Sequence, residues 1–279
     1  MPIRPFFAAI AALLLTNQSH ATSASEQLQQ LLAEHWQQAN KEQIFFRKDP
    51  DTFRMNGQLP DVSAQGRERR QQFNRQMQQK AEKIELSQLT AAERITLRLF
   101  NYERATEAES YQQFDYMFPM QAYSGYHSYF AGAVDNMSFL TTADYDNYLL
   151  SLADFPRYNQ QHITNLKQAI AKGYTHYCDS FAGYDKTISK HLVANVTDSV
   201  FYAPLAKQPP QFSAKQRQHY LNAGTRLISE TVLPEYEKLH HFFTSEYMPA
   251  CRKVVGISEL ADGKAYYQYL INFYTTTAM

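Results

Sequence analysis

The sequence predicts an all-α protein with roughly eight helices. Apolar residues recur at helical spacing along most of the 279-residue chain, and capping motifs mark helix starts at Thr90, Thr141 and Ser213. The chain has only 9 glycines, and few turn dipeptides separate the patterned segments. Strand signals are limited to a weak alternation over 195–202 and a Val-Val pair within 253–257.

In the first part of the chain, an opening helix carries its apolar face over residues 28–39. Residues 49–66 contain two prolines and two glycines and are typical of a loop. The glutamine-rich stretch 71–79 is typical of a solvated helix face. The helix that starts after Thr90 is expected to carry its apolar stripe on Ile95, Leu99 and Tyr102.

The later helices are marked by start and stop signals. A long helix is expected from Thr141, with a kink or restart at Pro156 and a stop at Gly173, because glycine adopts the left-handed conformation that ends helices. Another helix follows Ser213 and is expected to be interrupted at Pro234. The last patterned segment is rich in tyrosine and runs to the end of the chain.

The first 21 residues have the pattern of a secretory signal peptide. Arg4 precedes an apolar run over 6–15, and small residues at Ser19 and Ala21 suit cleavage after position 21. The alternative is an apolar first helix of the fold. No later stretch approaches the roughly 18 apolar residues of a membrane span. We therefore expect an exported helical domain over 22–279, periplasmic or extracellular, without a membrane span after cleavage.

The charge balance argues against two classes of partner. The chain has 27 basic and 27 acidic residues, so no basic excess is available for phosphate groups. Nucleic acid and anionic membranes are therefore not expected to bind it.

The two cysteines, Cys178 and Cys251, leave two alternatives open. In an oxidising compartment they are able to form a disulfide, and otherwise they are buried, unpaired thiols. Neither belongs to a CxxC motif or to the Cys-His spacing of a zinc site.

No catalytic motif is present. A helical zinc peptidase needs two histidines one turn apart with a glutamate beside them, and no HExxH or HxxEH occurs here. His240 and His241 are adjacent, so they point to different helix faces. A GxSxG nucleophile elbow, a Walker loop and a GxGxxG loop are also missing from the sequence. We therefore assign no catalytic residue and no metal ligand.

An irregular stretch over 118–140 is crowded with aromatic side chains. Such a stretch either lines a cleft for peptides or sugars or packs over a helix seam with its hydroxyl groups satisfied. If it lines a cleft, Gln121 and His127 are the polar groups expected to face a ligand. The aromatic residues concerned are Tyr123, Tyr126, Tyr129 and Phe130.

The end of the sequence predicts a truncated domain. An aromatic helical pattern runs into three threonines without a cap or a polar tail, whereas chain ends are usually frayed and polar. The alternatives for this segment are contact with an extended peptide, by β-augmentation, and ordinary packing at a domain seam. The residues concerned are Tyr274, Thr275, Thr276 and Thr277.

Several of these segments, in the same order, resemble the bacterial domain-of-unknown-function family 885. The resemblance covers roughly residues 25–279 and is distributed over many short motifs. These are QAYSG at 121–125, TADY at 142–145, FPRY at 155–158, AIAKG at 169–173, VFYAPL at 200–205 and YTTT at 274–277.

The resemblance implies that this chain is an amino-terminal half. In such proteins the later half resembles a helical zinc metallopeptidase and holds the metal motif, so zinc and catalytic residues are implied for residues that are not in this sequence. The chain would then line a peptide cleft and pack against the missing half, and alone it would be inactive. The alternatives are a free-standing helical module that binds a peptide or glycan, and a truncated product without activity.

Overall fold

The computed structural model describes residues 22–43 and 57–275. Within these ranges the chain is almost entirely helical, which confirms the predicted all-α class. The predicted signal peptide over 1–21, part of the predicted loop over 49–66, and Thr276 and Thr277 lie outside the described residues. No helix in the described part of the chain is both long and apolar enough for a membrane crossing.

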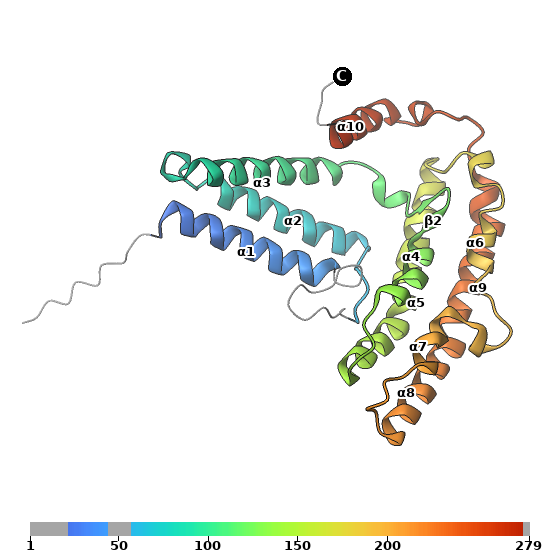
Figure 1. Cartoon of the computed structure of the whole chain (residues 1–279). Coiled ribbons are helices and arrows are strands. Elements are labelled where there is room, and N and C mark those ends of the chain that lie inside the picture. The colour runs from blue at the N-terminus through green and yellow to red at the C-terminus, as the bar shows by residue number, and fades with distance from the viewer. Residues whose placement is uncertain (1–21, 44–56, 276–279) are drawn as a thin grey trace, which may run out of the picture.

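Three helices form an N-terminal bundle, α1 (Ala24–Gln43), α2 (Ala64–Ala81) and α3 (Ala91–Ser110) (Figure 1). Ser63 and Thr90 cap α2 and α3 through their side chains, and Thr90 forms the predicted capping box with Glu93. The small core of the bundle is apolar and includes Leu28, Leu31, Met77, Leu97 and Phe100.

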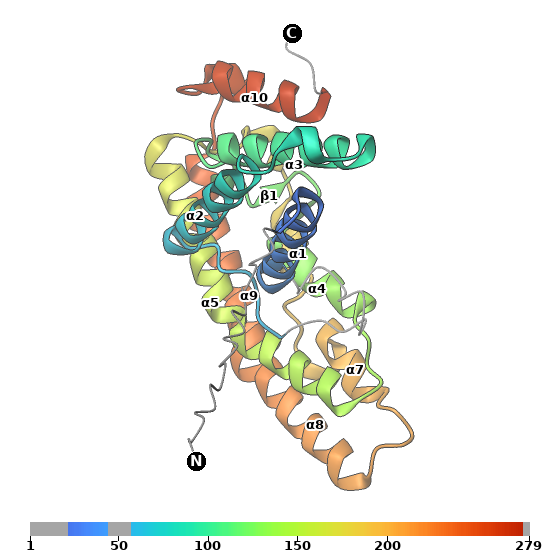
Figure 2. The same ribbon diagram turned by 90° about the vertical axis from the view of Figure 1, so that its left-hand side faces the viewer.

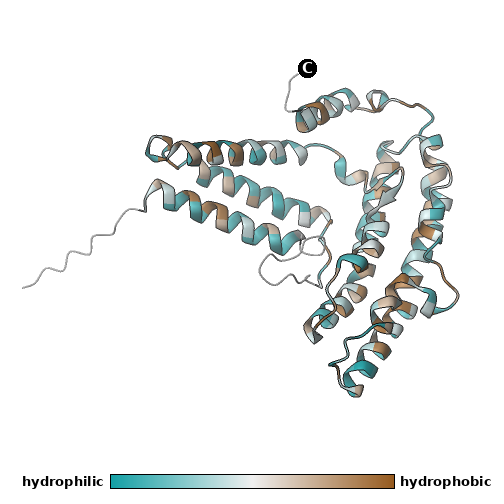
Figure 3. Cartoon of the chain, in the orientation of Figure 1, coloured by the Kyte–Doolittle hydropathy of each residue, from teal (hydrophilic) through white to brown (hydrophobic). Residues whose placement is uncertain are grey.

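The apolar stripe predicted for α3 faces solvent instead of the core. Ile95 and Leu99 are 67% and 56% exposed, and Tyr102 is also exposed, whereas Leu97 and Phe100 are buried in the bundle. Figure 3 shows the apolar first half of α3. Helical spacing identifies a stripe but does not decide which of two stripes is covered, because that depends on the neighbouring helices.

The helices from α4 to α9 pack as a main layer, in which α5 runs beside the rod formed by α8 and α9 (Figures 1 and 2). The elements of this layer are α4 (Tyr126–Ala133), α5 (Thr142–Lys172), α6 (Asp185–Ser189), α7 (Ala203–Ala206), α8 (Ala214–Leu227) and α9 (Leu233–Phe242).

The expected ends of α5 are confirmed, α5 does not restart at Pro156, and the interruption expected at Pro234 occurs just before it as a π-helical stretch. Helix α5 begins with a capping box at Thr141 and ends at Gly173, which has a positive φ of 75°. Pro156 lies inside the continuous α5 helix. A π-helical stretch over Ile228–Val232 joins α8 to α9, so Pro234 falls in the first turn of α9, where its missing N–H costs no helix hydrogen bond.

The only paired strands in the described residues form a two-residue hairpin, β1 (Met120–Gln121) and β2 (Ser124–Gly125), with Met120 opposite Gly125. The weak strand signals at 195–202 and 253–257 do not produce strands; the first segment holds two short 3-10 helices instead. Among the described residues, neither segment pairs with a neighbouring strand.

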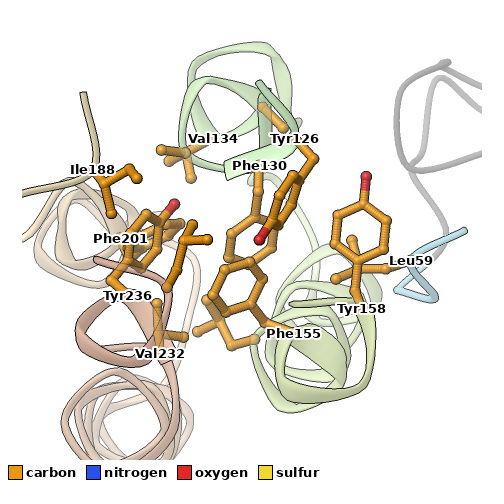
Figure 4. Close-up of a cluster of buried hydrophobic side chains, with 14 of the residues drawn as sticks. Leu59, Tyr126, Phe130, Val134, Phe155, Tyr158, Ile188, Phe201, Val232 and Tyr236 are labelled. Carbon is orange, nitrogen blue, oxygen red and sulfur yellow. The ribbon is translucent and has the colours of Figure 1, made fainter. Parts of the chain in front are cut away.

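The core of the main layer is built from aromatic rings. Phe130 and Phe155 stack with their centroids 4.3 Å apart, facing each other between α4 and α5 (Figure 4). Buried tyrosine hydroxyls donate to backbone carbonyls, as Tyr148 does to Phe201 at 2.6 Å and Tyr145 to Pro204 at 2.8 Å. The high tyrosine content is therefore accounted for largely by packing with satisfied hydroxyl groups.

The segment before α2 joins the N-terminal bundle to α5. Asp154 accepts from the amide of Leu59 at 2.9 Å, and Arg157 donates to the Leu59 carbonyl at 2.7 Å. One turn and two turns farther along α5, Gln161 and Asn165 bind the backbone of Val62. Polar side chains of α5 thus form hydrogen bonds with the backbone N–H and C=O groups of this segment, and these bonds position the start of α2.

Cys178 and Cys251 are joined as a disulfide, with their Cα atoms 5.1 Å apart. This is one of the two alternatives that the sequence leaves open. The bond ties the segment after α5 to the segment after α9, and backbone hydrogen bonds between Cys178 and Arg252 and between Arg252 and His176 hold the same segments.

The final helix, α10 (Gly263–Thr275), lies at the end of the molecule where α3 meets the main layer (Figure 2). Phe114 stacks on Tyr174 at 4.2 Å and also contacts Tyr266 of α10. The Tyr266 hydroxyl donates a hydrogen bond to the Asp115 carboxyl group. This aromatic cluster holds the beginning of α10, while its last residues are more exposed.

Candidate functional site

The predicted ligand-contacting residues that the structure describes differ in their exposure to solvent. Gln121 is exposed on β1, and His127 is fully buried at the start of α4. Tyr274 is 77% exposed near the end of α10, and Thr275 is exposed beside it, with its hydroxyl donating to the carbonyl of Ile271. Exposure leaves Gln121 and Tyr274 available for contact, while His127 has no access to a ligand.

The expectation that His127 faces a ligand is therefore corrected. Its Nε2 atom lies 3.0 Å from the hydroxyl of Thr187 and 3.1 Å from that of Ser128. Burial lowers the pKa of His127 to about 3, and electrostatic repulsion from protonated His191 and from Lys190 adds to this effect. His127 lies on the same helix face as core residues, so its burial follows from the packing of α4 on α6.

The aromatic residues of the 118–140 stretch divide between the two alternatives. Tyr126 and Phe130 pack in the core. Tyr123 and Tyr129 are exposed, and the Tyr129 hydroxyl lies 3.0 Å from that of Ser124. The hairpin turn between β1 and β2 presents Tyr123 to solvent, so only part of this stretch is a surface.

A different place in the fold has the geometry of a binding site. A pocket of about 510 Å³ lies between the first half of α2, the end of α3 and the 3-10 helix Asp115–Met117. Pockets that hold small ligands usually have volumes of roughly 300–1,000 Å³. Its lining includes Arg67, Arg70, Gln71, Tyr111, Asp115 and Tyr116.

Arg67 lines this pocket from α2. It lies in the first turn of α2, and its Nη1 atom donates to the carbonyl of Val62 at 2.9 Å and to Oδ1 of Asn165 at 3.1 Å. Its guanidinium carbon lies 3.7 Å from the centroid of the Tyr116 ring, so the planar group stacks on the phenol. These contacts fix the plane of the guanidinium, and partial burial lowers the pKa of Arg67.

The pocket carries charges of both signs. Arg70 is paired with Glu42 at 3.2 Å and also donates to the carbonyl of Asp61. Burial raises the pKa of Asp115, although the hydrogen bond from Tyr266 opposes that shift. Burial also raises the pKa of Tyr111, and its hydrogen bond to Glu107 adds to the effect. The site thus combines a positioned arginine with neutral hydroxyl and phenol groups.

Sequence reasoning missed this pocket. The available signal is the short run Arg67-Glu68-Arg69-Arg70, three arginines in four residues at the start of α2. The run precedes the glutamine-rich stretch, which as a whole is typical of a solvated helix face. Tyr111, Asp115 and Tyr116 are about 45 residues away in the sequence, and nothing local connects them to the arginines.

The described residues do not form a site for the zinc ion that the family resemblance implies. No three His, Cys, Asp or Glu side chains in ranges 22–43 and 57–275 are grouped so that they could hold a metal ion. Two buried histidines, His127 and His162, pack against tyrosine rings. We derive no chemical step through zinc in this chain.

Comparison with known proteins places the fold in a family. The family described as "Bacterial protein of unknown function (DUF885)" matches residues 46–279. The chain is also similar to the crystal structure of a "putative lipoprotein" from Colwellia psychrerythraea, with a TM-score of 0.75 and 13% sequence identity. That match covers 93% of this chain and 47% of the other, so this chain spans about half of its length. No curated protein sequence matches the chain.

Proposed function

This chain belongs to the bacterial DUF885 family, and we propose that it is the amino-terminal helical part of an exported, metallopeptidase-like protein in which it walls a peptide cleft. The observation that carries the proposal is the relation to the solved relative. Nearly all of this chain follows that fold, and it accounts for about half of the relative's length. A fold of this size that recurs inside a longer chain is expected to have a packing surface for the remainder.

An uncovered apolar face on α3 supports such a packing surface. Ile95, Leu99 and Tyr102 lie on one side of α3 and are exposed. The Tyr102 hydroxyl reaches the carbonyl of Asn272 on α10, at 3.5 Å, and Phe273 beside it is also exposed. Contiguous apolar surfaces of soluble proteins usually mark contacts with other segments or partners. We assign this face to packing against the later, zinc-binding half.

Export is part of the proposal. The signal-peptide pattern over 1–21 and the disulfide between Cys178 and Cys251 both suit an oxidising compartment. The similar solved structure is described as a "putative lipoprotein", and this description also agrees with export. Mass spectrometry of the protein purified from its host would test the proposal: a mature chain that starts at Thr22 supports it, and an intact Met1 argues against it.

The genomic sequence beyond the codon for Met279 provides the most direct test of the peptidase relation. An in-frame or adjacent segment that encodes an HExxH-like motif supports the proposal. A stop codon without any neighbouring gene of that kind counts strongly against it and leaves the truncated, inactive product. A second test adds zinc to this chain alone, with casein as substrate. We expect no hydrolysis, and hydrolysis that a chelator abolishes would contradict the assignment of zinc to the later half.

A free-standing binding module is the second candidate. The observation that favours it is the pocket at Arg67, all of whose lining residues belong to the described part of this chain. This candidate predicts that residues 22–279 unfold cooperatively by themselves and bind a peptide or glycan without metal. Aggregation of the isolated chain, with rescue by the later half expressed in trans, would exclude it.

A further inference from the structure

We propose that the pocket between α2 and the end of α3 binds a carboxylate group on the free edge of the Arg67 guanidinium. For a peptide ligand the carboxylate is either the chain's C-terminal group or an acidic side chain. The assignment to a peptide rests on the proposed function, whereas the carboxylate contact rests on the pocket alone. Four observations lead to it.

First, one edge of Arg67 remains available. The two hydrogen bonds to Val62 and Asn165 both use Nη1. Among the described residues, no acceptor is bonded to Nε or Nη2, and neither atom is enclosed in the protein. These two atoms form the edge of the guanidinium that matches the two oxygens of a carboxylate, with two parallel hydrogen bonds.

Second, the position of this edge is set before any ligand arrives. Tyr116 covers one face of the guanidinium at 3.7 Å, and the Nη1 contacts prevent rotation about the end of the side chain. A lysine at this position would offer neither the planar fork nor the stacking contact. Little side-chain entropy is therefore lost when the ligand binds.

Third, Arg67 differs from its neighbours in its charge partners. Arg69 is paired with Asp61 at 2.6 Å, Arg70 with Glu42 at 3.2 Å, and Arg104 with Glu107. Within the described ranges, Arg67 has no carboxylate within ion-pair distance. Asp61 acts on it only through a weaker long-range attraction. A half-buried cation without a bonded anion is the group in this region that gains most from an incoming carboxylate.

Fourth, the remaining walls restrict what is attached to that carboxylate. Gln71, Ser110 and Gln113 supply neutral polar groups, and Tyr111 adds a phenol. Glu68 and Asp115 also line the pocket, and their carboxyl groups oppose the binding of ligands with several negative charges. We therefore expect a ligand with one carboxylate and an uncharged body, about the size of a tripeptide for a volume near 510 Å³.

The test measures binding of three peptides to the protein encoded by the complete gene, by isothermal titration calorimetry. N-acetyl-trialanine carries a C-terminal carboxylate, N-acetyl-Ala-Asp-Ala amide carries one on a side chain, and N-acetyl-trialanine amide carries none. The buffer contains 1,10-phenanthroline, a chelator without carboxylates, so that metal-dependent hydrolysis does not consume the peptides. We expect at least one acid to bind roughly tenfold or more tightly than the neutral amide, because bonds to charged groups contribute about 1.5–3 kcal/mol.

Two variants and a matched control assign the contact to Arg67. Arg67→Gln should weaken binding of the acid roughly tenfold or more. Gln71→Glu keeps the side-chain shape and places a negative charge one turn along the same face of α2, so it should weaken binding about threefold or more. Arg75→Gln removes an exposed arginine from the same helix and should leave binding unchanged. Circular dichroism confirms that each variant is folded.

The outcomes separate this inference from the proposed function. Comparison of the two acids identifies the source of the carboxylate. Equal binding of the acids and the neutral amide would overturn the carboxylate site while leaving a peptide cleft intact. Binding of an acid that Gln71→Glu and Arg67→Gln leave unchanged would also overturn it. The absence of any binding would overturn it too, and the peptidase relation would still be judged independently from the sequence downstream of Met279.

Discussion

Asn74 on α2 and Arg104 on α3 bind each other in both directions. The amide of Asn74 donates to the backbone carbonyl of Arg104 at 2.8 Å, and the Arg104 guanidinium donates to Oδ1 of Asn74 at 3.1 Å. Both side chains are buried, in a bundle whose other inward residues are mainly apolar. This reciprocal pair sets the position of α3 along α2 and turns the Leu97 side of α3 inward.

Replacement of Asn74 by alanine is expected to destabilise the protein by about 1–3 kcal/mol, because the buried Arg104 guanidinium loses an acceptor. Urea unfolding followed by circular dichroism measures the change. Gln76→Ala is the matched control, since Gln76 is exposed on the same helix, and it should change the free energy of unfolding by less than about 0.5 kcal/mol. Equal effects of the two substitutions would show that the pair contributes nothing.

Two glycines should respond to alanine with opposite signs. A Cβ atom at Gly66 in α2 would lie 2.4 Å from the backbone oxygen of Asp61, so Gly66→Ala should destabilise the fold by about 1–3 kcal/mol. At Gly132 in α4 a Cβ atom meets nothing within 4 Å. Gly132→Ala should therefore stabilise by about 0.5–1 kcal/mol, the usual helix preference for alanine. Thermal unfolding compares them, and stabilisation by both would refute the close approach at Asp61.

Buried histidines should make the protein less stable in mild acid. Burial lowers the pKa of His162 to about 3, and nearby His127 adds to this shift. In the unfolded chain a histidine has a pKa of about 6.5. The contribution of neutral His162 to the free energy of unfolding is therefore complete above that pH and is lost as the pH falls toward 3. For this residue alone we expect a loss of about 2 kcal/mol between pH 7.5 and pH 5.

His162→Phe isolates that contribution. The His162 ring stacks on Tyr126 at 3.9 Å, and its two nitrogens have no partner among the described residues. Phenylalanine keeps the stacking and removes the titration, so urea midpoints measured from pH 7.5 to pH 5 should fall less steeply than in the unchanged protein. Identical slopes would show that His162 does not contribute.

Loss of the disulfide should lower stability without unfolding the region around it. Cys178 and Cys251 are 73 residues apart, and closing a long loop typically contributes about 2–4 kcal/mol. The backbone hydrogen bond from Cys178 to Arg252 and the hydrogen bond from the Thr175 hydroxyl to the Ala250 carbonyl do not depend on the disulfide. Thermal unfolding of a double Cys→Ser variant should give a loss within this range, and an unchanged midpoint would indicate that the cross-link is energetically silent.

Much of the secondary structure could be predicted because its signals are local. Thr141 and Gly173 bound α5 through a capping box and a left-handed glycine, and both act on backbone groups within a few residues. The start of α8 at Ser213 follows from the same chemistry. The π-helical junction before Pro234 did not follow, because it reflects how the α8–α9 rod packs along α5.

The candidate site could not be predicted in the same way. The aromatic stretch over 118–140 suggests a cleft, yet the packing of α4 turns His127 inward and leaves Tyr123 outside. The Arg67 guanidinium is held in position by Tyr116 and Asn165, which are 49 and 98 residues distant in the sequence. Only the meeting of α2, α5 and the 3-10 helix brings these groups together.

The sequence by itself determined the all-α class, the helix caps and the family to which the chain belongs, since periodicity, capping and motif order are written in neighbouring residues. Tertiary structure alone decided which stripe of α3 is covered, which histidines are buried and where a guanidinium keeps a free edge. The physical reason is that burial and pairing depend on residues distant in the sequence. On α3, for example, two sets of apolar residues both recur at helical spacing, and the neighbouring helices decide which set is buried.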